Sequence, residues 1–152
     1  MNQVKQAVKS WIDDQKRNYS LLEDVPVVLN GQQEDVVMPL IVVIDGSSNV
    51  IEQNGVRLHG VMEVGLTVEL HTVPEESTQS GTPYADAVTM ESGLFEILGN
   101  RKSLDFLNAS NNLQVFDNLT SSGIISVRDD RRITSYDLVI TACLNNQQPQ
   151  ST

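Results

Sequence analysis

Residues 60–73 read GVMEVGLTVELHTV and carry the clearest periodic pattern in the chain. Apolar side chains occupy every second position, at Val64, Leu66, Val68 and Leu70. Because successive side chains of a strand point to opposite faces, this alternation predicts a β-strand with one apolar face and one face open to water. Immediately before it, residues 50–58 favour neither helix nor strand, and Asp45–Asn49 (DGSSN) has the composition of a loop.

Two β-rich runs precede this strand. The first, Val25–Leu29, is followed by the turn dipeptide Asn-Gly. The second spans Val36–Ile44, and Pro39 inside it predicts that pairing begins after the proline or at an edge of the sheet. Leu40–Ile44 is apolar on both faces, which predicts a strand that is covered on both sides.

Helical periodicity appears twice. Over residues 4–22 one face is apolar, and its members are Val4, Ala7, Val8, Trp11 and Ile12. We expect Trp11 to pack against the sheet. Residues 83–98 repeat apolar side chains at spacings of three and four, after a Thr-Pro helix start and before a glycine that favours a helix end.

The last third of the chain predicts strands. Leu113–Phe116 is short, and Gly123–Val127 with Ile133–Leu144 predicts a hairpin. The element order α-β-β-β-α-β-β-β therefore predicts an α+β fold, in which a mixed or antiparallel β-sheet packs against two α-helices and ends in a C-terminal β-hairpin. By its length the chain is expected to be a single domain over residues 1–144, with a disordered polar tail over 145–152.

The chain is acidic, with 20 acidic and 10 basic residues and a net charge of −10. The sequence has no basic stripe of the kind that grips DNA. No apolar run is long enough to span a bilayer, and the first residues do not resemble a secretory signal. The single cysteine, Cys143, is interpreted as a small core residue. These features predict a soluble protein without a membrane partner or tight DNA binding.

No constellation of catalytic residues stands out. Glycine-rich phosphate loops and a GxSxG nucleophile motif are absent from the sequence. The two histidines, His59 and His71, lie in and beside the alternating strand, and we interpret both as surface residues rather than metal ligands. Adjacent acidic pairs are interpreted as solvated surface, at Asp13-Asp14, Glu75-Glu76 and Asp129-Asp130. We therefore expect no catalytic, cofactor-binding or metal-binding residues, and a protein that is not an enzyme.

The densest charge feature is Arg128-Asp129-Asp130-Arg131-Arg132, at the tip of the predicted hairpin. One interpretation is a solvated turn. The other is a subunit or partner contact, because mixed charges in one turn suit a salt-bridged interface with an acidic neighbour. On either interpretation, charge reversal at Arg131 and Arg132 is expected to change the free energy of unfolding by no more than about 0.5 kcal/mol.

The layout as a whole resembles the tail terminator proteins of long-tailed bacteriophages. The matching segments are a first helix (VKQAVKSWI), a strand that begins at a proline (PLIVVI), a long alternating strand (MEVGLTVELHTVP), a second helix (YADAVTMESGLFEIL) and a closing hairpin (SGIISVRDDRRITSYDLVITACL). The hairpin, with its charged turn and the Tyr-Asp step before the final alternation, is the most suggestive of these segments.

The resemblance implies a structural protein of the virion, assembled in the host cytoplasm and located at the junction of tail and head. Copies would form a ring, expected to be a hexamer, that caps the tail tube, stops tail polymerisation and supports head–tail joining. The implied partners are other copies of the chain, the tail tube protein and a head connector or neck protein. DNA would pass through the lumen without specific binding, since six copies at −10 carry about −60 in total.

Three alternatives remain. A head-side neck protein, either adaptor or stopper, has a similar size and layout, and the partner bound first, tail tube or connector, would separate it from a terminator. A small cellular ligand-binding module would respond to metabolites in a thermal-shift assay rather than self-associate. An enzyme would show a pocket in which His59 or His71 lies beside carboxylates.

Overall fold

A computed structural model of the chain describes residues 2–29, 38–53, 56–72, 82–100, 102, 113–121, 123–128 and 131–144. In chain order the elements are α1 (Asn2–Gln15), the 3-10 turn η1 (Lys16–Asn18), β1 (Val27–Leu29), β2 (Leu40–Gln53), β3 (Val56–Thr72), α2 (Thr82–Gly99), β4 (Leu113–Thr120), β5 (Ile124–Arg128) and β6 (Arg131–Leu144). This order confirms the predicted α+β fold and its C-terminal hairpin.

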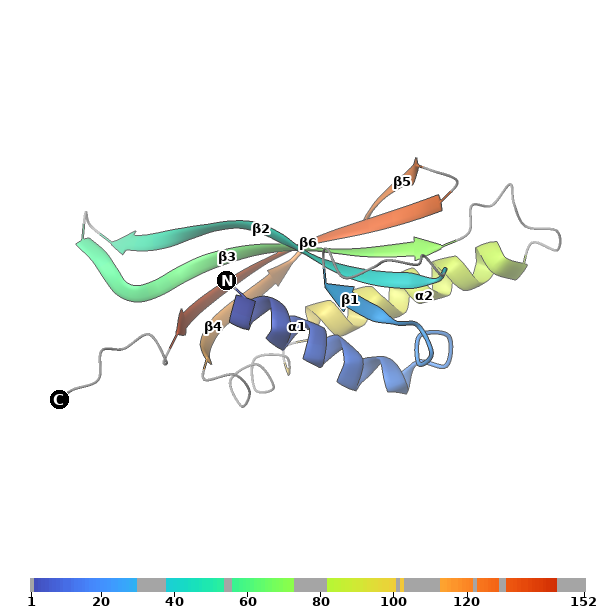
Figure 1. The fold of residues 1–152 in the computed structure, drawn as a ribbon, viewed down its shortest axis with the longest axis horizontal. Coiled ribbons are helices and arrows are strands. Elements are labelled where there is room, and N and C mark those ends of the chain that lie inside the picture. The colour runs from blue at the N-terminus through green and yellow to red at the C-terminus, as the bar shows by residue number, and fades with distance from the viewer. Residues whose placement is uncertain are drawn as a thin grey trace.

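The sheet has six strands in the order β1-β2-β3-β6-β4, and β5 also pairs with β6. Only the β1–β2 pair is parallel among these pairings, so the sheet is mixed. β4 and β5 pair with successive parts of β6, which is therefore bonded to three strands. Both helices lie on one face of the sheet (Figure 1).

The core lies between this face and the two helices. All four apolar residues of the alternating strand are buried, as are the apolar residues of α1. Trp11 is buried with them, and its indole N–H donates to the carbonyl of Ile97 in α2 at 3.1 Å. Burying each large apolar side chain contributes about 1.5–3 kcal/mol, so this alternation accounts for much of the stability of the sheet. The contact through Trp11 joins the two helices to each other as well as to the sheet.

The strand after Pro39 is covered on both sides, as predicted. Pairing of β2 begins at Leu40, directly after the proline. Ile41 and Val43 belong to the core under the helices, while Leu40 and Val42 are buried on the opposite face.

The first helix is shorter than predicted. α1 ends at Gln15 rather than at residue 22, and the chain continues through η1 into a turn. The Lys16 ammonium donates to the carbonyls of Glu23 and Val25, at 3.2 and 2.8 Å, which stabilises this reversal. Leu22 reaches the core from the turn and not from a helix.

The loop predicted over Asp45–Asn49 is wrong. β2 runs through this stretch, and a shift of register between Asp45 and Ser48 marks a bulge. At the bulge Gly46 crosses Gly65 so closely that a Cβ on Gly46 would lie 2.6 Å from the Gly65 carbonyl oxygen. The loop-like composition therefore allows a bulge and a close strand crossing.

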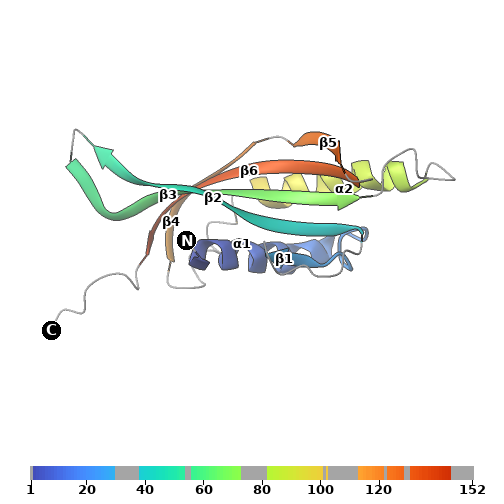
Figure 2. The same cartoon turned by 45° about the horizontal axis from the view of Figure 1, so that its top comes forward.

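β6 pairs with β3 as far as Val61, and past that residue β2 and β3 continue as a two-stranded hairpin, in which most of the described part of the undecided stretch 50–58 lies. We call residues 51–53 and 56–60 the arm. Figures 1 and 2 show that the arm projects past both helices, away from the body of the molecule.

Candidate assembly surface and adjoining pocket

Exposed large apolar side chains gather at one edge of the sheet. Among the side chains that the structure describes, all of them belong to α2, β4, β5 or β6: Val88, Phe95, Leu119, Ile124, Ile125, Val127 and Val139. We call these seven residues the apolar edge. The described parts of α1, β1, β2 and β3 contribute none. Such clustering is typical of a surface that contacts another protein.

β5 is the centre of the apolar edge. Ile124 and Ile125 are 67% and 50% exposed although successive residues of a strand face opposite sides. In the described part of the chain β5 pairs with β6 alone, so its other edge has no strand beside it. An edge strand that is apolar on both faces is a ready template for a further chain.

Phe95 connects the apolar edge to the core. Its ring stacks on Tyr136, with 6.1 Å between ring centroids and 19° between ring planes. The Tyr136 hydroxyl donates to the backbone carbonyl of Glu91 at 2.7 Å. Burial raises the pKa of Tyr136, the charge of Glu91 raises it further, and Arg132 lowers it. The exposed ring of Phe95 thus packs on Tyr136, whose own position is stabilised by the hydrogen bond to Glu91.

Arg132, one of the five residues of the charged tip, bonds within its own chain. Its guanidinium donates to both carboxylate oxygens of Glu91, at 2.8 and 3.1 Å, and both side chains are mostly buried. Thr134 donates its hydroxyl to the same carboxylate. The prediction that charge reversal at Arg132 leaves stability nearly unchanged is therefore wrong, because it would place two carboxylates together in a buried site.

Arg131 lies on the opposite face of the sheet, against His71. The guanidinium contacts Nδ1 of His71 at 3.1 Å, and Nε2 lies 2.9 Å from a carboxylate oxygen of Glu69. Since arginine can only donate, Nδ1 accepts and the ring proton is on Nε2, facing Glu69. His71 is only 6% exposed, so its interpretation as a surface residue is wrong.

The other members of the tip are less informative. Arg128 ends β5, and its backbone register partner in β6 is Arg131. Asp129 and Asp130 lie outside the described residues. The structure thus brings Arg131 and Arg132 into contacts with their own chain, while a contact of the tip with a partner stays a prediction.

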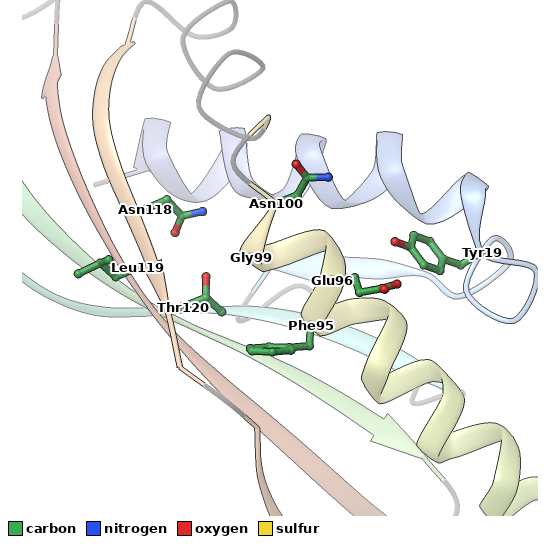
Figure 3. A pocket seen from close by; sticks show the side chains of 8 residues that line it. All are labelled: Tyr19, Phe95, Glu96, Gly99, Asn100, Asn118, Leu119 and Thr120. Atoms are coloured by element: carbon green, nitrogen blue, oxygen red, sulfur yellow. The ribbon is translucent and has the colours of Figure 1, made fainter.

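A pocket of about 590 Å³ adjoins the apolar edge, at the C-terminal end of α2 (Figure 3). Its lining comes from three elements: Tyr19 after η1; Phe95, Glu96, Gly99 and Asn100 at the end of α2; and Asn118, Leu119 and Thr120 of β4. Desolvation raises the pKa of Tyr19 most, and the charge of Glu96 and a hydrogen bond with the Glu96 side chain raise it further. Tyr19 and Glu96 therefore form a polar pair on one side of the pocket.

Hydrogen bonds tie β4 to the helix end at the floor of this pocket. The Asn118 amide and the Thr120 hydroxyl both donate to the carbonyl of Leu98, at 3.2 and 3.1 Å. These bonds satisfy a carbonyl that a helix end leaves without an intrahelical partner. These two hydrogen bonds fix β4 against the end of α2, where the pocket lies.

The remaining candidate residues do not assemble into a reactive site in the described structure. No group of three or more His, Cys, Asp or Glu there could hold a metal ion. Cys143 is half-buried on the helix-free face rather than in the core, so its predicted position is wrong. The side chain of His59 lies outside the described ones. Among the described helices, none combines the length and apolar character needed to cross a membrane.

Sequence reasoning did not single out the apolar edge or the pocket. The adjacent isoleucines at 124 and 125 were a usable signal, since apolar residues on both faces of an edge strand are unusual in a monomer. The pocket had no local signal, because its lining combines residues from three separate parts of the chain.

No protein-family model matches the sequence, and no curated protein matches it. Among solved structures, 26 chains match. One of them superposes with a TM-score of 0.54 over 93% of this chain and 94% of its own length, at 10% sequence identity. At this identity the likeness is one of fold alone, and it extends over nearly the whole of both chains.

Proposed function

We propose that this protein is a structural subunit of a virion, a tail terminator that forms a ring and caps the tail tube of a long-tailed bacteriophage. The observation that carries the proposal is the apolar edge, because a chain that works alone rarely exposes apolar side chains on both faces of an edge strand. A surface of this kind favours a role in assembly over catalysis.

Two further features support a ring. The arm projects from the body at a place other than the apolar edge, so the subunit offers two different surfaces for contact (Figure 1). Contacts between two different surfaces of identical subunits are heterologous, and they close into a ring when the rotation allows it. The sequence resemblance supplies the particular ring, a hexamer between the tail tube and the head connector.

The test of assembly uses the exposed strand. Ile125→Lys replaces a side chain that is already half exposed, so folding should be retained while the apolar contact is lost. Ser20→Lys, at an exposed position near η1, adds the same charge away from the edge and is the matched control. In sedimentation velocity we expect the wild type and Ser20→Lys to associate and Ile125→Lys to remain monomeric. If all three proteins associate equally, the apolar edge is not the surface through which copies of the chain bind each other.

The test of the terminator role is electron microscopy of tails made with and without this protein. Without it we expect over-long or irregular tails that fail to join heads. Normal tail length with failed joining would favour a head-side neck protein instead. Tails of normal length that also join heads would end the proposal, and a monomer stabilised by a metabolite in a thermal-shift assay would favour the ligand-binding alternative.

A further inference from the structure

A buried histidine connects the charged tip to the end of β3 on the helix-free face of the sheet. Each ring nitrogen of His71 contacts one charged side chain. Nδ1 lies 3.1 Å from the guanidinium of Arg131, and Nε2 lies 2.9 Å from a carboxylate oxygen of Glu69. The side chains of His71 and Glu69 are 8% and 16% exposed, so the ring and its carboxylate partner are largely shielded from water.

These contacts require a neutral imidazole. An arginine side chain has only N–H donors and is not deprotonated in proteins, so Nδ1 of His71 has to accept the hydrogen bond from Arg131. Nδ1 can accept only while it carries no proton, which leaves the ring proton on Nε2, facing Glu69. The bond to Arg131 therefore exists in only one of the two protonation states of His71.

Protonation reverses the role of Nδ1. Both nitrogens of an imidazolium are donors, so an N–H of His71 would face the N–H groups of Arg131 at a separation of 3.1 Å. Burial strengthens the repulsion between two such positive groups, because less water screens them. Glu69 would keep its hydrogen bond from Nε2 and gain an ion pair. The contact that has to break is thus the one with Arg131.

The strands on either side of His71 place apolar residues next to the ring. Its register partners are Leu40 in β2 and Ile133 in β6, and both are buried. The further charged groups on the neighbouring strands are Asp137, which stands opposite Thr67 and accepts its hydroxyl at 3.0 Å, Arg128, whose backbone pairs with Arg131, and Arg132, which bonds to Glu91 on the other face. Glu69 and Arg131 are therefore the described charges that respond directly to the protonation of the ring.

We infer that His71 is a proton-sensitive switch for Arg131: the neutral ring holds the guanidinium against the sheet, and the imidazolium releases it. Histidine side chains ordinarily change protonation between about pH 5 and pH 8, which is the range in which the switch operates. Release adds a mobile positive charge to the tip of the hairpin, where an acidic partner can bind it. The switch is a property of the single chain and does not depend on the ring assembly proposed above.

NMR spectroscopy of the monomeric protein tests the switch with two measurements. Long-range ¹H–¹⁵N spectra report the tautomer and the protonation of the His71 ring, and ¹³C relaxation at Cδ of Arg131 reports the mobility of that side chain. Between about pH 8 and pH 5 we expect a neutral ring with its proton on Nε2 to become an imidazolium. The order parameter of Arg131 Cδ should fall below about 0.6 with the same midpoint.

His71→Gln removes the titration while it offers the same kinds of contact. Its amide oxygen can accept from Arg131 and its amide N–H can donate to Glu69 at every pH. In this variant we expect Arg131 to stay immobile over the whole range. His59→Gln removes the other histidine of the chain and is the matched control, which should behave as the wild type does.

The wild-type measurements decide the question even if His71→Gln does not fold. The inference is overturned by a neutral ring with its proton on Nδ1, or by a ring that stays neutral in the folded protein down to about pH 5. It is also overturned if the mobility of Arg131 does not change while the ring takes up its proton. A release of Arg131 that persists in folded His71→Gln would show that another group controls it.

Discussion

The ion pair between Arg132 and Glu91 makes the packing of α2 on β6 sensitive to a single substitution. The two side chains are 12% and 13% exposed, and their two hydrogen bonds are 2.8 and 3.1 Å long. Arg132→Met removes the guanidinium but keeps much of its volume, which leaves the Glu91 carboxylate buried without its cation. Removing one partner of a buried pair costs about 3–5 kcal/mol, and we expect the free energy of unfolding to fall by that amount.

An exposed ion pair between η1 and the end of α1 is the matched control. Arg17 lies 2.9 Å from Asp14, but the two side chains are 71% and 38% exposed, so Arg17→Met should cost less than about 1 kcal/mol. Both variants can be compared in urea, with the fluorescence of the single tryptophan as the probe, at a concentration where the chain is monomeric. Equal costs for Arg132→Met and Arg17→Met would refute the argument that burial makes this pair matter.

A double variant sharpens the measurement. Glu91→Met with Arg132→Met removes both charges, and well-packed apolar replacements of a buried pair are often neutral. We expect the double variant to recover most of the lost stability, apart from about 1 kcal/mol for the Thr134 hydroxyl that loses its acceptor. A double variant no more stable than Arg132→Met would show that the single change acts through lost packing and not through the stranded charge.

Three other predictions follow from the core and the sheet. Trp11→Ala should lower the free energy of unfolding by about 3–5 kcal/mol and Trp11→Phe by about 1 kcal/mol, since the phenyl ring keeps most of the burial but not the N–H; circular dichroism in urea checks both. Gly46→Ala should destabilise by about 1–3 kcal/mol and move the amide resonances of the arm, whereas Gly99→Ala, with open space around its Cβ, should stay within about 0.5 kcal/mol. Tyr136 has a raised pKa, so its protonated hydroxyl contributes to the free energy of unfolding at pH values below the ordinary tyrosine pKa of 10.0, and this contribution is lost as the pH rises above 10.0. Tyr136→Phe should therefore make stability fall less at alkaline pH, measured by urea unfolding at several pH values.

The strongly periodic parts of the fold were predictable from the sequence, and the bulge in β2 was not. The alternation over residues 60–73 corresponds to a strand with the expected buried face. The helical spacing over 83–98 corresponds to α2, but only part of its apolar face is buried, since Leu94 and Leu98 lie in the core whereas Val88 and Phe95 are exposed. The loop-like stretch Asp45–Asn49 instead forms a bulge, because Gly46 has to pass the backbone of a neighbouring strand. That requirement depends on a contact between strands, which local composition does not contain.

At the candidate site, the contacts of the charged tip could not be predicted from the sequence either, because they also depend on residues far away in the chain. Its five residues stand out in the sequence, but the partner of Arg132 lies 41 positions away in α2 and the partner of Arg131 lies 60 positions away in β3. Five adjacent charges look the same in sequence whether they are solvated or bonded across the fold. Only the pairing of β6 with β3 and the packing of α2 separate the two cases.

The place of β6 in the sheet has a consequence for synthesis on the ribosome. β6 follows every other described strand in the chain, yet it lies inside the sheet, between β3 and the pair β4 and β5. Until it emerges, β3 has an open edge, and β4 and β5 have none of the partners described for them. The nascent chain thus carries an incomplete sheet until β6 emerges, and during that interval the open edge of β3 is exposed to pairing with other chains.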